Sequence, residues 1–175
     1  MKKLLIFFVV LVATTSFVRG AEFIVNNCPV TPVREEPSEA AEQSTQLLFG
    51  ELCEVEERKS SWVKIRSTID GQVGWVSAKM TTPIGEEDAM RLLGERAMGV
   101  VAKPMAVVTN IETGEKLMLT IGTRLPNYAN GMFEILGKQY LVDDSCVYEV
   151  RGERLEVKGE DVVRVAQSLL NVPYL

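Results

Sequence analysis

Short strand-like runs separated by turn residues constrain the fold of this chain more than any other feature. From Cys28 to Ile84 the sequence breaks into such runs, the pattern of a small barrel or sandwich. In "WVKIR", Val63 and Ile65 alternate with larger polar or aromatic residues, as a half-buried strand requires. Asp70-Gly71 then supplies a turn before "VGWV". Residues 62–76 are therefore predicted to form a β-hairpin within a first β unit.

The segment "VREEPSEAAEQSTQ", residues 33–46, interrupts this pattern. It has too little apolar content for a core strand and too many loop-forming residues for a helix. We expect a long acidic loop here.

A second β unit is predicted between residues 98 and 150. Its strand-like runs are separated by turn residues at Thr113-Gly114, Asn130-Gly131 and Gly137-Lys138. Before it, residues 85–97 begin with acidic residues, which favour a helix start. The rest of this segment carries a broad apolar stripe, which consists of Ala89, Met90, Leu92, Leu93 and Ala97.

The last predicted element is an amphipathic helix, preceded by the charged segment "RGERLEVKGED". Its apolar residues recur at the spacing of one helix face: Val162, Val163, Ala166, Leu169 and Leu170. Such a stripe requires a surface to pack against.

The first twenty residues have the character of a secretory signal peptide. Lys2 and Lys3 precede an apolar run, and small residues end the segment before Ala21. The run is shorter than the roughly 20 apolar residues that span a bilayer. We therefore expect a periplasmic or secreted protein that has no membrane contact after signal cleavage.

The net charge argues against a nucleic-acid partner. The formal charge is −5, and removal of residues 1–20 makes it three units more negative. Binding to a phosphate backbone requires a basic surface. The remaining length, about 155 residues, suits one ordinary domain or two small ones.

The chain contains no histidine, which limits its chemistry. Serine and cysteine hydrolases usually need an imidazole beside the nucleophile. The three cysteines, Cys28, Cys53 and Cys146, are widely spaced, so neither a zinc site nor one particular disulfide pair is indicated. No cofactor and no metal site are predicted. Carboxylate pairs such as Asp143 and Asp144 leave a glycosidase as a minor alternative.

The amino-acid sequence of the first β unit resembles that of a known protein family. "PVREEPS", "TQLLFGE", "WVKIR" and "DGQVGWV" follow one another as in a bacterial SH3-like (SH3b) domain. They are similar in particular to the first such domain of secreted NlpC-type cysteine peptidases, γ-D-glutamyl-L-diamino acid endopeptidases like dipeptidyl peptidase VI. The resemblance covers residues 28–83 well and residues 98–150 loosely.

The resemblance implies a mainly β fold with five parts. These are a signal peptide (1–20), a first SH3-like barrel (28–83), a helical connector (84–97), a second SH3-like barrel (98–150), and a linker with a C-terminal amphipathic helix (151–175). In this family a phrase similar to "PYLWGG" opens the catalytic domain, and the sequence ends at Pro173-Tyr174-Leu175. The catalytic residues are therefore expected beyond residue 175. Cys146, in "VDDSCVYEV", lacks the family's aspartate-cysteine-serine-glycine motif.

The function implied is non-catalytic recognition of murein stem peptides that have a free L-alanine amino end. A catalytic NlpC-type domain, in cis or in trans, is the implied protein partner. By resemblance, Glu42 is the first candidate to meet the substrate ammonium, and Glu36 is the second. Gln72 stands where the family commonly has a tyrosine, and Trp75 completes the candidate substrate-binding set. Solvent-exposed loop carboxylates and hairpin packing are the alternative roles for these residues.

A second hypothesis comes from the C-terminal helix. If its apolar stripe stays uncovered, the chain fits a free-standing periplasmic SH3-like adaptor that docks a partner protein through this helix.

Overall fold

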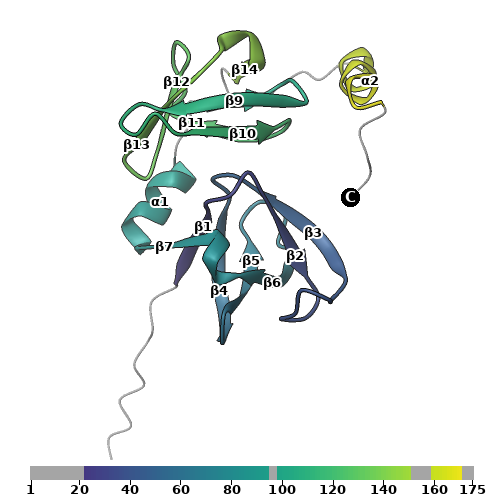
Figure 1. Cartoon of the computed structure of the whole chain (residues 1–175), viewed down its shortest axis with the longest axis vertical. Coiled ribbons are helices and arrows are strands. Elements are labelled where there is room, and N and C mark those ends of the chain that lie inside the picture. Colours follow the sequence, from purple (N-terminus) through teal and green to yellow (C-terminus); the bar gives the residue numbers. More distant parts are fainter. Residues whose placement is uncertain (1–21, 95–97, 151–158, 171–175) are drawn as a thin grey trace, which may run out of the picture.

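The computed structural model describes residues 22–94, 98–150 and 159–170. Two β units lie one above the other in Figure 1, and the short helix α1 lies where they meet. The predicted signal peptide, the first eight residues of the charged linker and the last five residues of the chain lie outside the described residues. Among the described residues, no helix is both long enough and apolar enough to cross a membrane.

The first β unit is one seven-stranded antiparallel sheet with the strand order β3-β2-β6-β5-β4-β1-β7. Its strands are β1 (Phe23–Asn26), β2 (Val30–Arg34), β3 (Gln43–Leu48), β4 (Leu52–Lys59), β5 (Trp62–Ser67), β6 (Val73–Ser77) and β7 (Thr81–Ile84), and the 3-10 helix η1 (Ala78–Met80) precedes β7. Strand β1 precedes residue 28 and pairs with both β4 and β7. The unit therefore extends over residues 23–84.

The predicted hairpin is confirmed. Strands β5 and β6 pair from Trp62 opposite Ser77 to Arg66 opposite Val73. Val63 and Ile65 are buried, as their alternation indicates. Gly71 has a φ of 74°, a left-handed conformation that glycine adopts without steric cost.

The predicted long loop is shorter than expected. Residues 33–34 belong to β2 and residues 43–46 to β3, so the loop comprises residues 35–42. Val33 is fully buried and is the apolar anchor of its strand. The prediction of a loop over 33–46 was wrong at both ends, because pairing of β2 with β3 satisfies the backbone of these mostly polar residues.

The interior of the first β unit is a compact apolar cluster. Its buried members come from six of the seven strands: Ile24, Val33, Leu47, Cys53, Val63, Ile65 and Val76. Strand β1 is buried along its whole length. Ile24 points into this cluster, whereas Phe23 and Val25 join the core of the second unit.

The second β unit contains two small antiparallel sheets, with strand orders β10-β9-β13-β12 and β11-β8-β14. Its elements are β8 (Met98–Val101), β9 (Met105–Asn110), β10 (Lys116–Thr120), β11 (Arg124–Pro126), β12 (Met132–Ile135), β13 (Lys138–Val142), η2 (Asp144–Cys146) and β14 (Val147–Val150). The mainly β architecture predicted from the sequence is confirmed.

The turns of the second unit agree with two of the three predictions. Gly114 and Gly131 both have positive φ. The third turn lies one residue earlier than predicted, because Ile135 pairs with Lys138 and leaves Leu136 and Gly137 as the loop. Leu136 has a φ of 50°, which is unusual for a branched side chain, and it packs against the core.

Helix α1 (Glu86–Gly94) begins one residue later than predicted, and only part of its predicted apolar stripe is buried. Ala89 is buried and Leu92 packs against the core, whereas Met90 and Leu93 are each 52% exposed. Residues at i and i+3 face the same side of a helix, so Ala89 and Leu92 both turn toward the core. Ala97 lies outside the described residues.

The two β units share one apolar core. Phe23, Val25, Phe49 and Leu52 of the first unit pack with Val101, Leu125, Phe133 and Tyr140 of the second unit, among others. The rings of Phe49 and Tyr140 meet edge to face, with centroids 5.9 Å apart.

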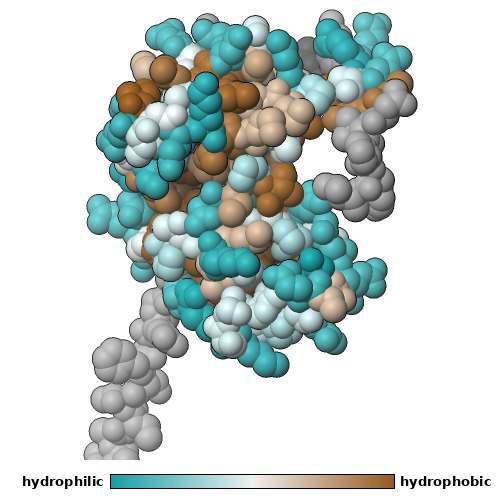
Figure 2. All heavy atoms as spheres, viewed as in Figure 1, coloured by the Kyte–Doolittle hydropathy of each residue, from teal (hydrophilic) through white to brown (hydrophobic). Residues whose placement is uncertain are grey.

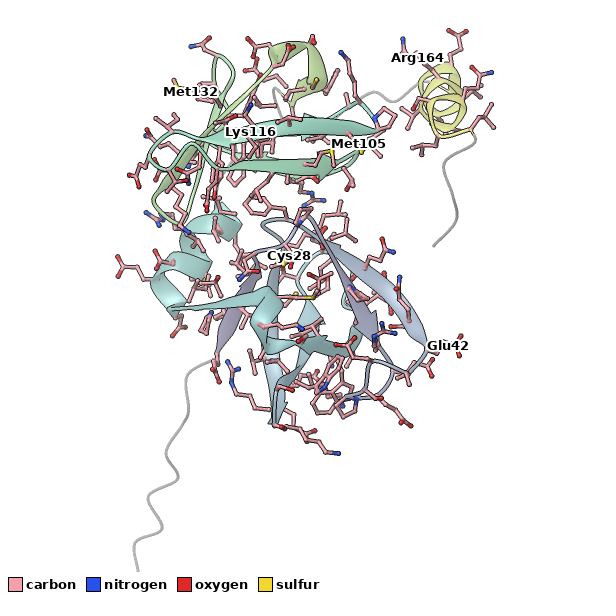
Figure 3. The ribbon with its side chains drawn as sticks, viewed as in Figure 1. Cys28, Glu42, Met105, Lys116, Met132 and Arg164 are labelled. Carbon is pink, nitrogen blue, oxygen red and sulfur yellow. The ribbon has the colours of Figure 1, made fainter. Side chains whose placement is uncertain are left out.

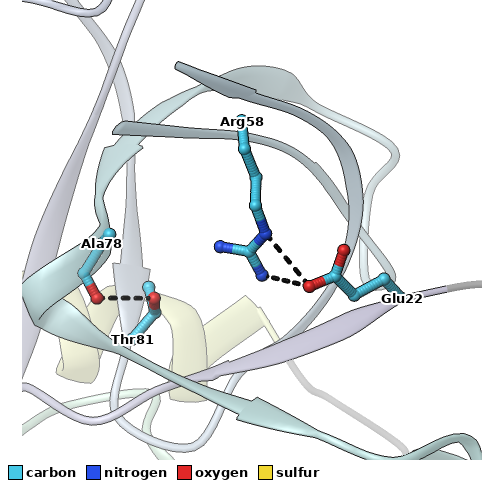
Figure 4. A network of polar contacts seen from close by, with 4 residues as sticks. All are labelled: Glu22, Arg58, Ala78 and Thr81. Carbon is cyan, nitrogen blue, oxygen red and sulfur yellow. Dashed lines mark hydrogen bonds and ion pairs between the residues drawn. The ribbon is translucent and has the colours of Figure 1, made fainter. Parts of the chain in front are cut away.

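Polar contacts close the ends of the first unit (Figure 4). The Arg58 guanidinium, on β4, donates to the Glu22 carboxylate just before β1. Both side chains are 40% exposed, so this pair contributes little to stability. The Thr81 hydroxyl donates to the Ala78 carbonyl oxygen over 3.0 Å and closes η1.

Helix α2 (Gly159–Ser168) confirms the predicted C-terminal helix. Every described residue from Val162 to Leu170 is exposed, the whole apolar stripe included. A second exposed apolar surface lies over the upper unit in Figure 2, where Met105, Val107 and Met118 project from β9 and β10.

Candidate binding site in the first unit

An acidic loop, residues 35–42, connects β2 to β3 and contains four glutamates. The backbone amide of Glu35 donates to the carbonyl oxygen of Glu42 over 3.0 Å and closes the base of the loop. Inside the loop, the amide of Ser38 donates to the carbonyl oxygen of Glu36 over 2.7 Å. The acidic loop therefore has a defined conformation of its own.

Arg34 attaches the acidic loop to the sheet. Its Nη1 donates to the carbonyl oxygen of Ala41 over 2.7 Å, and its Nη2 lies 3.7 Å from the Glu39 carboxylate. The side chain is only 19% exposed, although its Nε makes no hydrogen bond. Sequence reasoning missed this residue. The available signal was a single arginine between the strand residue Val33 and a run of glutamates.

Glu42 and Glu36, the two predicted ammonium-binding residues, are both exposed on this loop. Glu42 lies at the right-hand edge of the first unit in Figure 3 and points away from that unit. Within the part of the chain that the structure describes, neither carboxylate has an ion-pair partner within 4 Å. Both acceptors are therefore accessible to a cationic ligand.

Gln72 lies in the turn between β5 and β6 and is exposed. The turn is held by Asp70, whose carboxylate accepts from the Gln72 backbone amide over 3.0 Å. This hydrogen bond and one from the Ser67 side chain lower the pKa of Asp70. The Gln72 side chain is thus presented on a fixed turn.

Trp75 is 8% exposed and forms part of the sheet rather than an open platform. It lies opposite Arg34 of β2 on one side and opposite Lys64 of β5 on the other. The tryptophan therefore offers little of its ring to a ligand, which agrees with the packing role considered for it.

The strand register brings the acidic loop and the Gln72 turn to the same end of the sheet. Strands β2 and β6 are antiparallel and pair at Arg34 and Trp75. The loop leaves β2 after Arg34, and β6 begins after Gln72, so both connections lie beyond the same end of this strand pair. Gly74 permits close approach of the strands, because its ideal Cβ position is only 2.9 Å from the Arg34 carbonyl oxygen.

Of the three cysteines, Cys53 is unsuited to act as a nucleophile. All three are free thiols, and Cys53 is fully buried. Burial raises the pKa of the Cys53 thiol to about 12, with smaller contributions from Glu51 and Asp70. Cys53 is therefore a protonated, unreactive thiol at neutral pH. Within the described ranges, no three cysteine, aspartate or glutamate side chains gather into a metal-binding group.

Comparisons with known proteins agree with this architecture. Residues 33–79 match the family model of the bacterial dipeptidyl-peptidase SH3 domain. The structure is similar to an NlpC/P60 family protein from Bacillus cereus ATCC 10987, with a TM-score of 0.74 and 17% sequence identity. The match covers 87% of this chain and 65% of that protein, so the chain spans less than two thirds of its length.

Two further structures have much weaker similarity. NlpC2 from Trichomonas vaginalis gives a TM-score of 0.32 at 8% identity, over 85% of this chain and 56% of that one. NlpC1 from the same organism gives 0.33 at 10% identity, over 88% and 55%. These scores are too low to bear on the fold. A comparison with curated proteins finds no significant match.

An SH3 domain of this kind is by itself a non-catalytic module, and its family suggests a role in binding the cell wall. The family match includes the end of β2, the acidic loop, the Gln72 turn and Trp75. Residues 33–79 are therefore similar to a bacterial dipeptidyl-peptidase SH3 domain, within a fold that the chain shares with part of an NlpC/P60 family protein.

Proposed function

We propose that the first β unit binds the free amino end of a murein stem peptide through its acidic loop. The observation that supports this most strongly is the loop itself, an exposed group of four glutamates attached to the sheet by Arg34. Glu42 is the proposed acceptor for the ligand ammonium, with Glu36 as a second acceptor. Gln72 offers an amide to the peptide backbone from the adjacent turn.

Preorganisation gives the acidic loop an advantage over a mobile acidic segment. Ordering side chains and loops on binding opposes association, and a loop that is already folded avoids part of that cost. A hydrogen bond between a carboxylate and an ammonium contributes roughly 1.5 to 3 kcal/mol when it is desolvated. Glu42 is exposed, so the full strength requires a second surface that excludes water. A catalytic NlpC-type domain, in cis or in trans, is the proposed source of that surface.

The proposal includes a location outside the inner membrane, in the periplasm or beyond it. The signal-like segment at residues 1–20 supports this location. The murein stem peptide is present in the same compartment.

Binding calorimetry with a synthetic L-alanyl-γ-D-glutamyl-diamino acid peptide tests the proposal. Wild type is expected to bind the peptide, and Glu42→Gln is expected to weaken binding by about tenfold. Glu54→Gln is the matched control, because Glu54 is an exposed carboxylate on β4, outside the loop. If the wild type and Glu42→Gln bind the peptide with equal affinity, Glu42 does not contact the ligand ammonium.

The chain as described is proposed to bind this peptide without cleaving it. Incubation of the peptide with the purified chain, followed by chromatography of the products, is expected to return intact peptide. Hydrolysis that persists after replacement of Cys28, Cys53 and Cys146 would contradict this statement.

A second candidate function rests on the exposed face of α2. Val162 and Val163 in this amphipathic helix, and Leu170 in the turn directly after it, are each more than half exposed. Uncovered faces of this kind mark protein interfaces. The adaptor hypothesis predicts that Val162→Asp abolishes capture of a partner protein and leaves peptide binding unchanged. Loss of peptide binding in this variant would instead indicate that α2 takes part in peptide binding at the acidic loop.

A further inference from the structure

A small pocket lies at the junction of the two β units and α1. It has a volume of about 160 Å³ and is separate from the acidic loop. The first unit contributes residues 49–52 and 68–69, α1 contributes Leu92 and Leu93, and β11 contributes Arg124 and Pro126. We name this site the junction pocket.

The size and walls of the junction pocket suit one apolar side chain. Its lining is mainly apolar, with Phe49, Leu52 and Leu92 contributing to the walls. Pockets for larger ligands occupy roughly 300–1,000 Å³, whereas a cavity of about 150 Å³ lined by apolar side chains admits benzene. A group the size of a leucine side chain therefore fits this space.

Two charged side chains of opposite sign also line the junction pocket. Glu51 is partly buried there, and burial is the main reason why its pKa is raised. A hydrogen bond from the Leu48 backbone and the charge of Arg124 both oppose this shift. Among the described residues, neither Glu51 nor Arg124 has an ion-pair partner within 4 Å. The carboxylate is thus partly desolvated without a direct cationic contact, an arrangement that a ligand ammonium would relieve.

We propose that the junction pocket binds a small apolar amino acid in its zwitterionic form. The side chain of the ligand enters between Phe49 and Leu92. Its ammonium contacts Glu51, and its carboxylate contacts Arg124. An amino acid matches all three features, because its α-carbon carries an apolar side chain, an ammonium and a carboxylate. This site does not depend on the function proposed for the acidic loop.

Titration of ¹⁵N-labelled protein with L-leucine, followed by NMR, tests the proposal. The amide signals of Thr68, Ile69, Leu92 and Leu93, which line the pocket, are expected to shift together and saturate at millimolar leucine. N-acetyl-L-leucine, which lacks the ammonium, and L-leucinamide, which lacks the carboxylate, are each expected to bind about tenfold more weakly. Absence of shifts at these positions, or equal binding of all three compounds, would overturn the proposal.

Two substitutions test the assigned charges. Glu51→Gln and Arg124→Gln are each expected to weaken leucine binding by about tenfold, whereas Glu54→Gln is the control and leaves it unchanged. Arg124 is exposed, so its variant keeps the test valid if Glu51→Gln alters folding. Unchanged leucine affinity in a folded Arg124→Gln variant would exclude the proposed carboxylate contact. Murein peptide binding is expected to be unaffected in both variants, which separates this proposal from the acidic-loop site.

Discussion

Gly74→Ala tests whether the close packing of β2 on β6 fixes the first unit. Gly74 is buried in β6, and a Cβ at this position would lie 2.5 Å from Cγ1 of Val33 and 2.9 Å from the carbonyl oxygen of Arg34. Carbon atoms in contact normally lie roughly 3.5–4.0 Å apart, so the strands must separate by about 1 Å. Val33 is fully buried and has a stiff, branched side chain, so it has little room to move.

The expected loss of stability follows from two opposing effects. Overpacking of a well-packed core costs about 1–3 kcal/mol. Replacement of glycine by alanine also restricts the unfolded chain, which returns about 0.4–1 kcal/mol at a position whose backbone alanine can adopt. Gly74 has no positive φ, so this gain applies. The net expectation is a loss of about 1–2 kcal/mol in the free energy of unfolding.

Urea unfolding followed by tryptophan fluorescence measures this loss. Trp62 and Trp75 both lie in the hairpin strands and report on the first unit. Gly85→Ala is the matched control, because a Cβ at Gly85 meets no atom within 4 Å. Its effect is expected to stay within about 0.5 kcal/mol of zero. A Gly74→Ala variant as stable as the control would show that β2 is not held in the position described.

Three further predictions concern titratable groups. In the folded protein, a thiol reagent at neutral pH is expected to modify Cys28 but not Cys53, because a pKa of about 12 keeps the Cys53 thiol protonated. Rapid labelling of both cysteines would contradict the burial of Cys53. Burial raises the pKa of Glu51, so the folded state holds this proton more tightly and the free energy of unfolding of the wild type falls as pH rises through that pKa. Urea unfolding at pH 4 and pH 7 should therefore show that Glu51→Gln becomes more stable relative to the wild type at the higher pH. A stability difference between the two proteins that is the same at both pH values would refute this. Tyr128→Phe removes the hydroxyl that donates to Asp144 and is expected to lower the free energy of unfolding by about 1 kcal/mol, whereas an unchanged midpoint would show that water replaces this bond.

The β-hairpin and the C-terminal helix were predictable because each depends on local pattern. In β5, Val63 and Ile65 alternate with larger side chains, and Gly71 marks the turn that joins the strands. The apolar residues of α2 follow the helical period along the whole element. In both cases neighbouring residues alone carry the signal.

Other features depend on contacts between segments distant in sequence. The apolar pattern around Val33 is too short to indicate a strand, and only its pairing with β3 makes it one. Met90 and Leu93 of α1 remain half exposed, because only Ala89 and Leu92 of that helix pack into the core that the two units share. The junction pocket brings Glu51 near Arg124, 73 residues later, and no local pattern announces that proximity.

The acidic-loop site was predictable in part. Glu36 and Glu42 were selected by resemblance, and the structure places both on the exposed loop, although their role in binding stays a prediction. Arg34 could not be selected in the same way, because its function depends on a bond to the Ala41 carbonyl oxygen across the loop. A backbone acceptor leaves no mark in the sequence.

The most direct test of the central claim compares two murein peptides that differ only at the amino end. The affinity of the wild-type chain is measured by calorimetry for L-alanyl-γ-D-glutamyl-diamino acid and for its N-acetylated form. Recognition of the free ammonium by the acidic loop predicts that acetylation weakens binding by about tenfold or more, and that Glu42→Gln removes most of this difference. Equal affinity of the wild type for the two peptides would contradict the account.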